Sequence, residues 1–204
     1  LSFAHGRLCE IALAGGEADQ RHVLVQYAYT PAGDLEAVFD ALEQPYTFAY
    51  DSGHRLVRHT DRNGLSFYYT YQQHGDEWRV DHAWGDGGLY DYRFEYQDLL
   101  RERRITDSLG HVALIKLNED GLPINELDPL GGMTIFEYDD CGRTCAVVDP
   151  AGRRTEYHYD ARGNLVRLIR PDGRALVSAF DHDDKPVSIA DALGECWQQR
   201  FDAR

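Results

Sequence analysis

Apolar and polar residues alternate along this chain in short runs, and the runs return at a fixed distance. The stretch Arg153–Tyr159 is an example, and its last ring, Tyr159, recurs in steps of 21 residues. The recurring positions are Tyr29, Tyr50, Tyr71, Tyr96, Leu117, Tyr138, Tyr159, Phe180 and Phe201, with one four-residue slip between Tyr71 and Tyr96. Eight of these nine anchors are aromatic, although aromatics are only 12% of the chain. Self-similarity of this kind is typical of a repeat protein.

A second apolar residue precedes most anchors by two positions. These residues are Tyr27, Phe48, Tyr69, Phe94, Ile115, Phe136 and Tyr157. Residues two apart on a strand point to the same face, so each repeat is predicted to present two side chains, usually rings, on one side of a sheet.

Aspartate and glycine mark two turns in each repeat. Eleven residues after the anchor stand Asp40, Asp61, Asp107, Asp128, Asp149 and Asp191, and three residues further come Gly64, Gly85, Gly110, Gly131, Gly152, Gly173 and Gly194. The second turn directly follows the anchor, as in Asp139–Gly142 and Asp160–Gly163. Aspartate at the first turn position accepts hydrogen bonds from backbone amides, and glycine at the fourth takes a positive φ without strain. Each repeat is therefore predicted to contain two strands and two tight turns.

The predicted fold is an all-β antiparallel meander of 21-residue, two-stranded repeats. Such a repeat is too small to bury a core alone and must be stabilised by its neighbours. Residues 1–26 are expected to be an irregular opening segment with a polar loop at Gly15–Asp19, and residues 27–204 an array of about eight repeats. The slip makes 71–95 irregular, and because Gly85 is in phase with Tyr71, the four extra residues are expected between Gly85 and Tyr96. Circular dichroism is expected to show almost no helix.

Composition and charge limit the kinds of partner and ligand that the protein can have. The net charge of −14 argues against a nucleic-acid partner, and no apolar run approaches the roughly 18 residues of a membrane span. The cysteines Cys9, Cys141, Cys145 and Cys196 include no CxxC pair, so no metal and no cofactor is expected. Cys141 and Cys145 flank a turn and either face each other across it or remain free thiols. Clustered turn aspartates lack the spacing of a known calcium loop.

The candidate chemistry is sparse. Trp78, Trp84, His74 and His82 lie near the glycine-rich run Gly85–Gly88 and offer the best place for a ligand or an enzyme site. The carboxylate pairs Asp139–Asp140 and Asp183–Asp184 contain aspartates that recur in phase, which indicates turn residues rather than acid–base catalysts. No catalytic residue is assigned, and the chain is not expected to be an enzyme.

The segments Glu137–Arg143 and Tyr157–Leu165, followed by Asp149–Gly152 or Pro171–Gly173 turns, resemble the YD repeat of the Rhs proteins. The resemblance covers residues 27–204, is most specific at 134–181 and is weaker at 71–125. It implies a sheet that winds into part of a curved, spiralling shell, which in bacterial Rhs toxins encloses a C-terminal toxin domain. Similar shells occur in insecticidal toxin-complex proteins and teneurins.

The same resemblance implies partners and a destination. The partners would be the remainder of the shell, an enclosed toxin domain, and a secretion-system spike or chaperone. The protein would be made in the bacterial cytoplasm and secreted or delivered to target cells in interbacterial competition, for example by type VI secretion. Asp128–Gly131 resembles the cleavage junction of Rhs proteins locally, but further repeats follow, so it is read as an ordinary turn.

An alternative function is a carbohydrate- or receptor-binding repeat surface on a secreted or cell-surface protein. The shell hypothesis predicts aromatic rings packed between strands, whereas the binding surface predicts Trp and Tyr exposed in a groove. An enzyme in the 71–95 region needs polar groups that converge in a pocket. The chain starts without Met and stops inside a turn at Phe201–Arg204, so a fragment with unpaired edge strands is expected.

Overall fold

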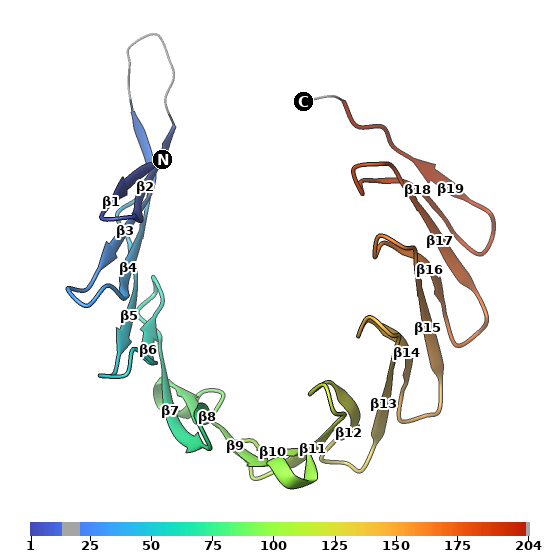
Figure 1. Ribbon diagram of the computed structural model, residues 1–204, viewed down its shortest axis with the longest axis horizontal. Coiled ribbons are helices and arrows are strands. Elements are labelled where there is room, and N and C mark those ends of the chain that lie inside the picture. Colours follow the sequence, from blue (N-terminus) through green and yellow to red (C-terminus); the bar gives the residue numbers. More distant parts are fainter. Residues whose placement is uncertain (14–20, 203–204) are drawn as a thin grey trace. The chain divides into compact units, whose positions relative to one another are not determined.

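The computed structural model describes residues 1–13 and 21–202 as a succession of antiparallel hairpins (Figure 1). The loop expected at Gly15–Asp19 and the end of the last turn, at 203–204, lie outside the described residues. The chain divides into unit 1, residues 1–95 and 106–110, and unit 2, residues 96–105 and 111–204.

Unit 1 begins with strands that already include part of the expected opening segment. Its strands are β1 (Ser2–Ala4), β2 (Arg7–Leu13), β3 (His22–Tyr29), β4 (Leu35–Asp40), β5 (Pro45–Tyr50), β6 (Leu56–Thr60), β7 (Ser66–His74) and β8 (Glu77–Gly85), followed by the 3-10 turn η1 (Asp86–Gly88). Strand β9 (Tyr92–Gln97) crosses the boundary between the units. From β1 to β9 each strand pairs antiparallel with the next.

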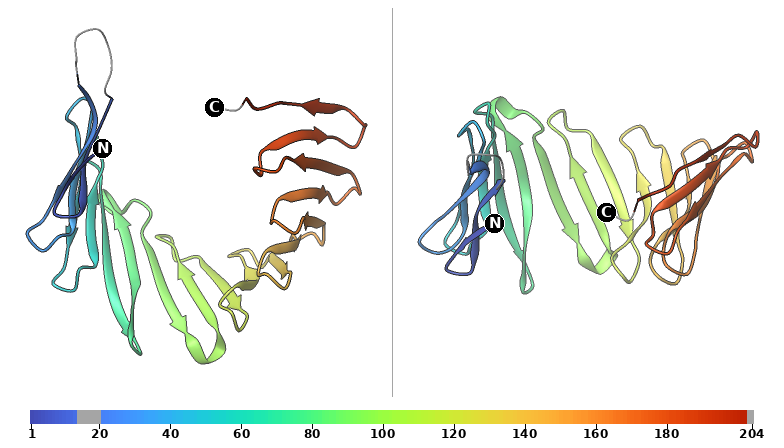
Figure 2. Two further views of the ribbon diagram at one scale, coloured as in Figure 1. Left: turned by 45° about the horizontal axis from the view of Figure 1, so that its top comes forward. Right: turned by 90° about the horizontal axis from the view of Figure 1, so that it is seen from above.

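Unit 2 repeats one hairpin with little variation. After the 3-10 turn η2 (Asp98–Leu100) come β10 (Glu102–Thr106), β11 (Val112–Leu117), β12 (Pro123–Leu127), β13 (Met133–Tyr138), β14 (Thr144–Val148), β15 (Arg154–Tyr159), β16 (Leu165–Ile169), β17 (Ala175–Phe180), β18 (Pro186–Ala190) and β19 (Cys196–Gln198). Strands from β11 to β19 pair in chain order, and both views of Figure 2 show them side by side.

The two 3-10 turns are the only helical segments among residues 1–13 and 21–202. The prediction of an all-β antiparallel meander with almost no helix is therefore confirmed. No helix in this described part is long and apolar enough to cross a membrane.

The turns follow one geometry. In the turn that starts at Asp149, the carbonyl accepts a hydrogen bond from Gly152 N at 2.8 Å, and Asp149 N donates to the carbonyl of Arg153 at 3.0 Å. Gly152 has a φ of 76°. This is a three-residue hairpin loop, a type I turn closed by a left-handed residue. The Asp149 carboxylate also accepts the amides of Ala151 and Arg153, both at 2.9 Å.

The same left-handed position is usually glycine. Gly131, Gly163, Gly173 and Gly194 have φ values of 85°, 96°, 79° and 83°. Where glycine is displaced by one place, at Gly53, the neighbouring His54 takes the left-handed conformation with a φ of 61°. Asp184 takes the left-handed conformation in its own turn, with a φ of 60°.

Every described pairing in which an anchor takes part has a β-bulge next to it, a feature the sequence analysis did not foresee. Tyr159 pairs with Leu165, whereas the preceding His158 pairs with Arg167, so Val166 is the extra residue. The same shift occurs next to Tyr29, Tyr50, Tyr71, Leu117, Tyr138 and Phe180. A bulge bends the strand and increases its twist, so each repeat carries its own built-in bend at the anchor.

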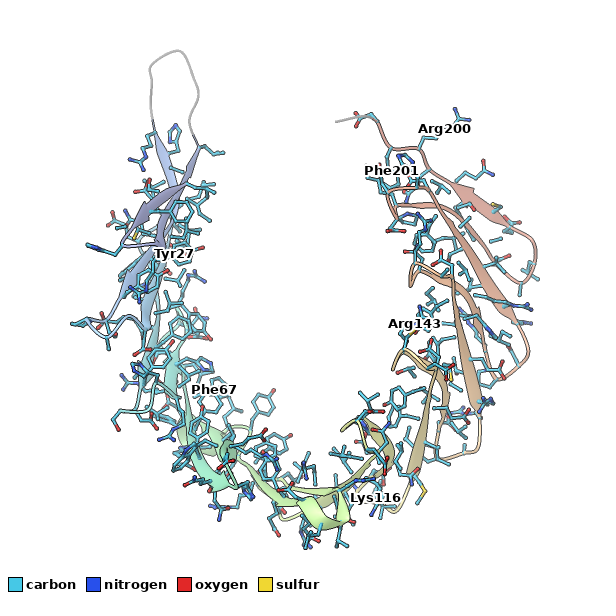
Figure 3. All side chains as sticks on the ribbon, viewed as in Figure 1. Tyr27, Phe67, Lys116, Arg143, Arg200 and Phe201 are labelled. Carbon is cyan, nitrogen blue, oxygen red and sulfur yellow. The ribbon has the colours of Figure 1, made fainter. Side chains whose placement is uncertain are left out.

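One face of the unit 2 sheet is apolar. Cross-strand neighbours on it are Phe136, Val147, Thr155, Tyr157, Leu168 and Leu176; we call this set the apolar face. The opposite face, here the ionic face, carries the charged or titratable residues Glu137, Arg154, Glu156, His158 and Arg167, interspersed with the aliphatic residues Ile135, Val148, Ile169 and Val177. Side chains stand out on both sides of the ribbon (Figure 3), so the sheet of this unit is a single layer.

Two predictions for the irregular region are wrong. Tyr71 pairs with Val80, nine residues later, whereas Tyr50 and Tyr159 pair six residues later. Three of the four extra residues therefore extend the β7–β8 hairpin, before Gly85. The extra residues were expected after Gly85. The two nine-residue strands instead pair further toward the hairpin end, and this leaves the anchor in place.

Gly85 is not a turn glycine. It is the last residue of β8, is buried and has an extended φ of −99°. It lies opposite Phe67, and a Cβ at this position would come within 3.0 Å of that ring and 3.1 Å of the Leu89 carbonyl oxygen. Glycine is needed here for close packing under an aromatic ring. Its agreement with the 21-residue spacing of the turn glycines is a coincidence.

Candidate functional site: the anchor ladder

The anchors occupy the places where neighbouring repeats join. Strands of successive repeats share only short ladders; between β14 and β15 the pairs run from Val148–Arg154 to Ala146–Glu156 and stop. Beyond that point the Tyr159 ring continues the contact, and its hydroxyl donates to the carbonyl of Thr144 at 3.0 Å. Thr144 is itself the residue that pairs with the previous anchor, Tyr138. The hydroxyl therefore ties one anchor to the partner of the one before it.

The same bond recurs. The hydroxyl of Tyr138 donates to Pro123 O at 2.7 Å and that of Tyr71 to Leu56 O at 2.7 Å, each fifteen residues back. Pro123 pairs with the anchor Leu117. We call this recurring bond, with its rings, the anchor ladder. Carbonyl groups removed from water need a hydrogen-bond donor, and the tyrosine hydroxyl supplies one to the part-buried residue that opens the second strand.

Not every anchor follows this rule. Tyr29 reaches Leu8 O at 2.9 Å, 21 residues back, and the Tyr50 hydroxyl makes no hydrogen bond with the described residues. Phe180 has no hydroxyl, and there the turns are joined by Asn164 Nδ2, which donates to Asp184 Oδ1 at 2.7 Å. Phe201 is 47% exposed.

Arginines from the turns cover several anchor rings. The Arg143 guanidinium lies 4.7 Å from the centroid of the Tyr159 ring, while its Nε donates to Asp139 Oδ2 at 2.7 Å. Arg55 repeats the arrangement with Asp51, at 2.7 Å, and with the Tyr71 ring, at 5.8 Å. A guanidinium held over a ring face is attracted by the ring quadrupole. Anchor, turn aspartate, turn arginine and the next anchor thus form a continuous chain between repeats; Figure 3 shows Arg143 in its place.

The electrostatics match this arrangement. Hydrogen bonds from the backbone and guanidinium of Arg143 hold the pKa of Asp139 below its usual range. The side chain and backbone of Arg153 lower the pKa of Asp149 in the same way, and the backbone of Asn164 lowers that of Asp160. Partial burial raises the pKa of Tyr138 and of Tyr71. The aspartates are therefore ionised turn caps at neutral pH, and the tyrosines stay protonated donors.

Unit 1 carries an aromatic stack on one face of its sheet. His59 lies between Phe48 and Phe67 in the cross-strand order, and its ring stacks on Phe67 at 5.2 Å between centroids. Tyr46 and Tyr69 stack on the same imidazole at 5.4 and 5.7 Å, and the Tyr69 hydroxyl lies 3.1 Å from His59 Nδ1. Such stacked pairs contribute beyond the area they bury.

The residues singled out around 71–95 do not converge. Trp84 stacks on His82 at 4.2 Å, and His82 Nε2 lies 2.7 Å from Asp91 Oδ1. Trp78 lies near the other end of β8 under the Arg55 guanidinium, at 3.8 Å, and His74 pairs with Glu77 at the hairpin end. Asp86 caps the β7 backbone by accepting Ser66 N at 2.8 Å. These contacts hold the hairpin and its following loop together.

The cysteines Cys9, Cys141, Cys145 and Cys196 are free thiols. Cys145 is the extra residue of the bulge next to Tyr138, whereas Cys141 is exposed in the adjacent turn. No group of three or more His, Cys, Asp or Glu side chains that could hold a metal ion occurs in residues 1–13 and 21–202.

Comparisons with known proteins place this ladder in a family. The sequence pattern of the RHS repeat matches residues 29–66 and 145–175. Comparison with curated proteins gives no match. Among solved structures, the crystal structure of TcdB2-TccC3-Cdc42 aligns with a TM-score of 0.50 and 9% identity over 97% of this chain and 14% of that chain. The crystal structure of TcdB2-TccC3 aligns with a TM-score of 0.46 and 10% identity over 91% of this chain and 14% of that chain.

These results define the class of repeat protein. The hairpin array with one anchor per 21 residues is a YD-type repeat protein, and the chain spans 14% of the length of the solved chains that it matches. Both matched segments contain anchors or the strands that pair with them. The chain therefore carries RHS repeats in these two segments, as the resemblance in the sequence indicated.

Proposed function

We propose that this chain is part of the wall of an Rhs shell that encloses a C-terminal toxin domain and helps to deliver it in interbacterial competition. One observation carries the proposal. The sheet of each unit is a single layer, and the described residues bury no large side chain fully. Even so, one face of each sheet gathers the rings and aliphatic side chains described above.

The physical argument concerns that apolar face. Burial of apolar surface stabilises a protein by about 25 cal/mol for each Å² removed from water. A repeat array with one apolar and one ionic face therefore gains from having polypeptide against the apolar side and solvent against the other. On the ionic face, Arg154 Nη2 binds Glu137 Oε2 at 2.9 Å, and its Nε binds Glu156 Oε1 at 3.1 Å.

The proposed partners follow from this role. They are the rest of the shell, which continues the sheet beyond the described strands, an enclosed toxin domain, and a secretion-system spike or chaperone. The protein would be made in a bacterial cytoplasm and then secreted or delivered, by a type VI or a similar route. The chain itself is proposed to be structural and not an enzyme.

The alternative, a binding surface for carbohydrates or receptors, requires rings that are free to meet a ligand. Tyr71, Tyr138 and Tyr159 are part-buried, and their hydroxyls are engaged by the neighbouring strand. That geometry supports packed layers between strands and hence the wall. Trp78, Tyr90 and Trp197 differ, because they are 49%, 64% and 59% exposed.

The test uses the complete natural protein and two substitutions on neighbouring residues of β16. Leu168 lies on the apolar face and Arg167 on the ionic face. In limited proteolysis, the downstream domain should resist cleavage in the wild type and in Arg167→Glu, and should become sensitive in Leu168→Glu. A downstream domain that is cleaved as fast within the complete protein as in isolation would refute the enclosing role.

A further inference from the structure

A cavity of about 300 Å³ opens between two neighbouring turns of unit 2, Arg170–Arg174 and Asp191–Glu195. Its lining includes Arg170, Arg174, Leu176, Asp191, Ala192 and Trp197. A volume near 300 Å³ is at the lower end of the range for small-molecule sites and fits a single ring with one polar group. The cavity belongs to a place where the repeat departs from its own pattern three times.

The first departure is Arg170. The turns that start at Asp128, Asp149 and Asp191 all have aspartate at this position. Asp149 and Asp191 each accept two backbone amides of their turn. An arginine cannot accept these bonds, and in this turn Asp172 Oδ1 accepts the amide of Arg174 instead, at 3.0 Å. The Arg170 guanidinium makes no ion pair or hydrogen bond within residues 1–13 and 21–202, which leaves its charge available.

The second departure is Ala192. The preceding turns have proline at this position, as Pro129, Pro150 and Pro171. Pro150 packs against the turn before it, since a Cβ on Gly132 would lie 3.0 Å from the Pro150 Cβ. Alanine lacks the rest of the pyrrolidine ring, so the space between this turn and the previous one stays open.

The third departure is Trp197. The equivalent positions one, two and three repeats earlier are Leu176, Thr155 and Thr134. Trp197 thus adds an indole wall at the place where the proline is missing and the aspartate is replaced. Three substitutions with one outcome, an open cavity with an aromatic wall and an unpaired cation, favour a ligand site over random drift of the repeat.

The charges of the lining define the ligand. Arg174 Nε lies 3.6 Å from Asp172 Oδ2, and one oxygen of the Asp191 carboxylate is engaged by the amides of Leu193 and Glu195, both at 2.9 Å. Arg170 is therefore the cation without a counter-ion, in a chain whose net charge is −14. Guanidinium groups bind carboxylates through paired N–H donors, and the indole and Leu176 suit a ring.

We propose that this cavity binds an aromatic carboxylate, with the carboxylate on Arg170 and the ring against Trp197 and Leu176. The ligand is either a small free acid or the C-terminal aromatic residue of a peptide, because both present the same group. The cavity shares Leu176 with the apolar face of the proposed wall, but its test uses small probes and does not depend on any enclosed domain.

Isothermal titration calorimetry of the protein with N-acetylphenylalanine tests the proposal, with the neutral N-acetylphenylalanine amide as the matched probe. The acid should bind at least about tenfold more tightly than the amide, because only the acid can pair with the guanidinium. Equal binding of acid and amide, or no heat with either, would overturn the proposal.

Two substitutions locate the site. Arg170→Asp restores the residue found in the equivalent turns, so the fold should be kept while binding of the acid falls at least about tenfold. Trp197→Ala should weaken both the acid and the amide. Arg153→Gln, at the position equivalent to Arg174 one repeat earlier, is the control and should bind as the wild type does. Unchanged binding in Arg170→Asp would place the ligand elsewhere and refute the assignment.

The source of the ligand is decided by a third probe, a five-residue peptide that ends in phenylalanine, with a free or an amidated terminus. Binding of the free acid alone means a small-molecule site, and binding of the free-terminus peptide as well means a site for a chain end. If only the amidated peptide binds, the carboxylate is not recognised and the proposal fails.

Discussion

The regular hairpins of residues 134–169 and the extended hairpin of residues 66–85 contact the preceding repeat in the same way, although the hairpins differ in length. In both, the anchor hydroxyl reaches a carbonyl fifteen residues back, from Tyr159 to Thr144 and from Tyr71 to Leu56. In both, a turn arginine lies over the anchor ring. They differ beyond the anchor, where the second hairpin continues to His74 and Glu77 before it turns.

That difference shows which part of the repeat is fixed. The anchor and its bulge are held from two sides, by the pairing within the repeat and by the contacts to the preceding one. Apart from Trp78, which lies under the Arg55 guanidinium, the hairpin end pairs with itself, so added residues cost loop entropy and gain further strand pairs. In this repeat three of the four added residues therefore lie in the hairpin, and the anchor hydrogen bond is kept.

The largest expected effect is loss of an anchor ring. Tyr159→Ala and Tyr71→Ala should each lower the free energy of unfolding by about 3 kcal/mol, because both remove a part-buried ring and its hydrogen bond. Urea unfolding followed by circular dichroism measures it. The comparison predicts similar costs in the two hairpins; a cost near zero at either anchor would mean that its ring does not join the repeats.

The next effect separates two kinds of glycine. Gly152 has a left-handed φ of 76° with open space around it, and Gly85 is extended under the Phe67 ring. Gly152→Asn should cost less than about 1 kcal/mol, since asparagine tolerates this conformation. Gly85→Asn should cost about 1 to 3 kcal/mol through overpacking.

Valine should destabilise the turn glycines more than asparagine does. Gly152→Val, and likewise Gly173→Val, should cost about 1 to 3 kcal/mol, because a β-branched residue is strained at positive φ. Thermal unfolding of the four variants gives the ranking. Equal costs for asparagine at positions 85 and 152 would show that the two glycines are needed for the same reason.

Acid should weaken the regular turns. The folded-state pKa values of Asp139, Asp149, Asp160 and Asp181 are depressed by hydrogen bonds from their own turns. Their contribution is therefore present above the unfolded value of about 3.9 and is lost as the pH falls through the lower folded values. Unfolding followed from pH 6 to pH 2 should show this loss, and Asp139→Asn should reduce its steepness. A slope unaffected by this substitution would contradict the assignment.

The smallest effect should come from shortening the extended hairpin. Replacing the segment from Gln72 to Arg79 by the sequence of residues 160–164 gives Tyr71 the regular six-residue spacing to its partner. The free energy of unfolding should change by less than about 1 kcal/mol, because the anchor hydrogen bond remains and the contact that is lost, between Arg55 and Trp78, is half-exposed. A loss as large as that of Tyr71→Ala would show that the added strand length itself stabilises the repeat.

Much of the fold could be predicted from the sequence, because the turn chemistry is local. Asp149 and Gly152 dictate their turn without help from distant residues, and the alternation in Arg153–Tyr159 dictates the strand. The position of the extra residues could not be predicted, since Gly85 matched the repeat phase while playing a different part. A glycine indicates a turn only when the residues beside it also favour turns. The residue before Gly85 is Trp84, which favours a strand.

The anchor ladder was only half visible in the sequence. Periodicity identified Tyr138 and Tyr159 but not the partner of each hydroxyl, because that partner is a backbone carbonyl and leaves no mark on residue type. The bulge did leave a signal in the paired apolar residues that open the second strand, such as Leu165–Val166 and Leu56–Val57. Strict alternation would have placed a polar residue at one of the two positions.

The most direct test of the ladder compares two tyrosines on one strand. Tyr159 donates its hydroxyl to Thr144, whereas the hydroxyl of Tyr157, two residues earlier on β15, makes no hydrogen bond with the described residues. Hydrogen exchange at the amides of β14 and β15 should show that Tyr159→Phe lowers the local opening free energy by about 1 kcal/mol while Tyr157→Phe leaves it unchanged. Equal effects of the two substitutions would contradict the claim that anchor hydroxyls hold successive repeats together.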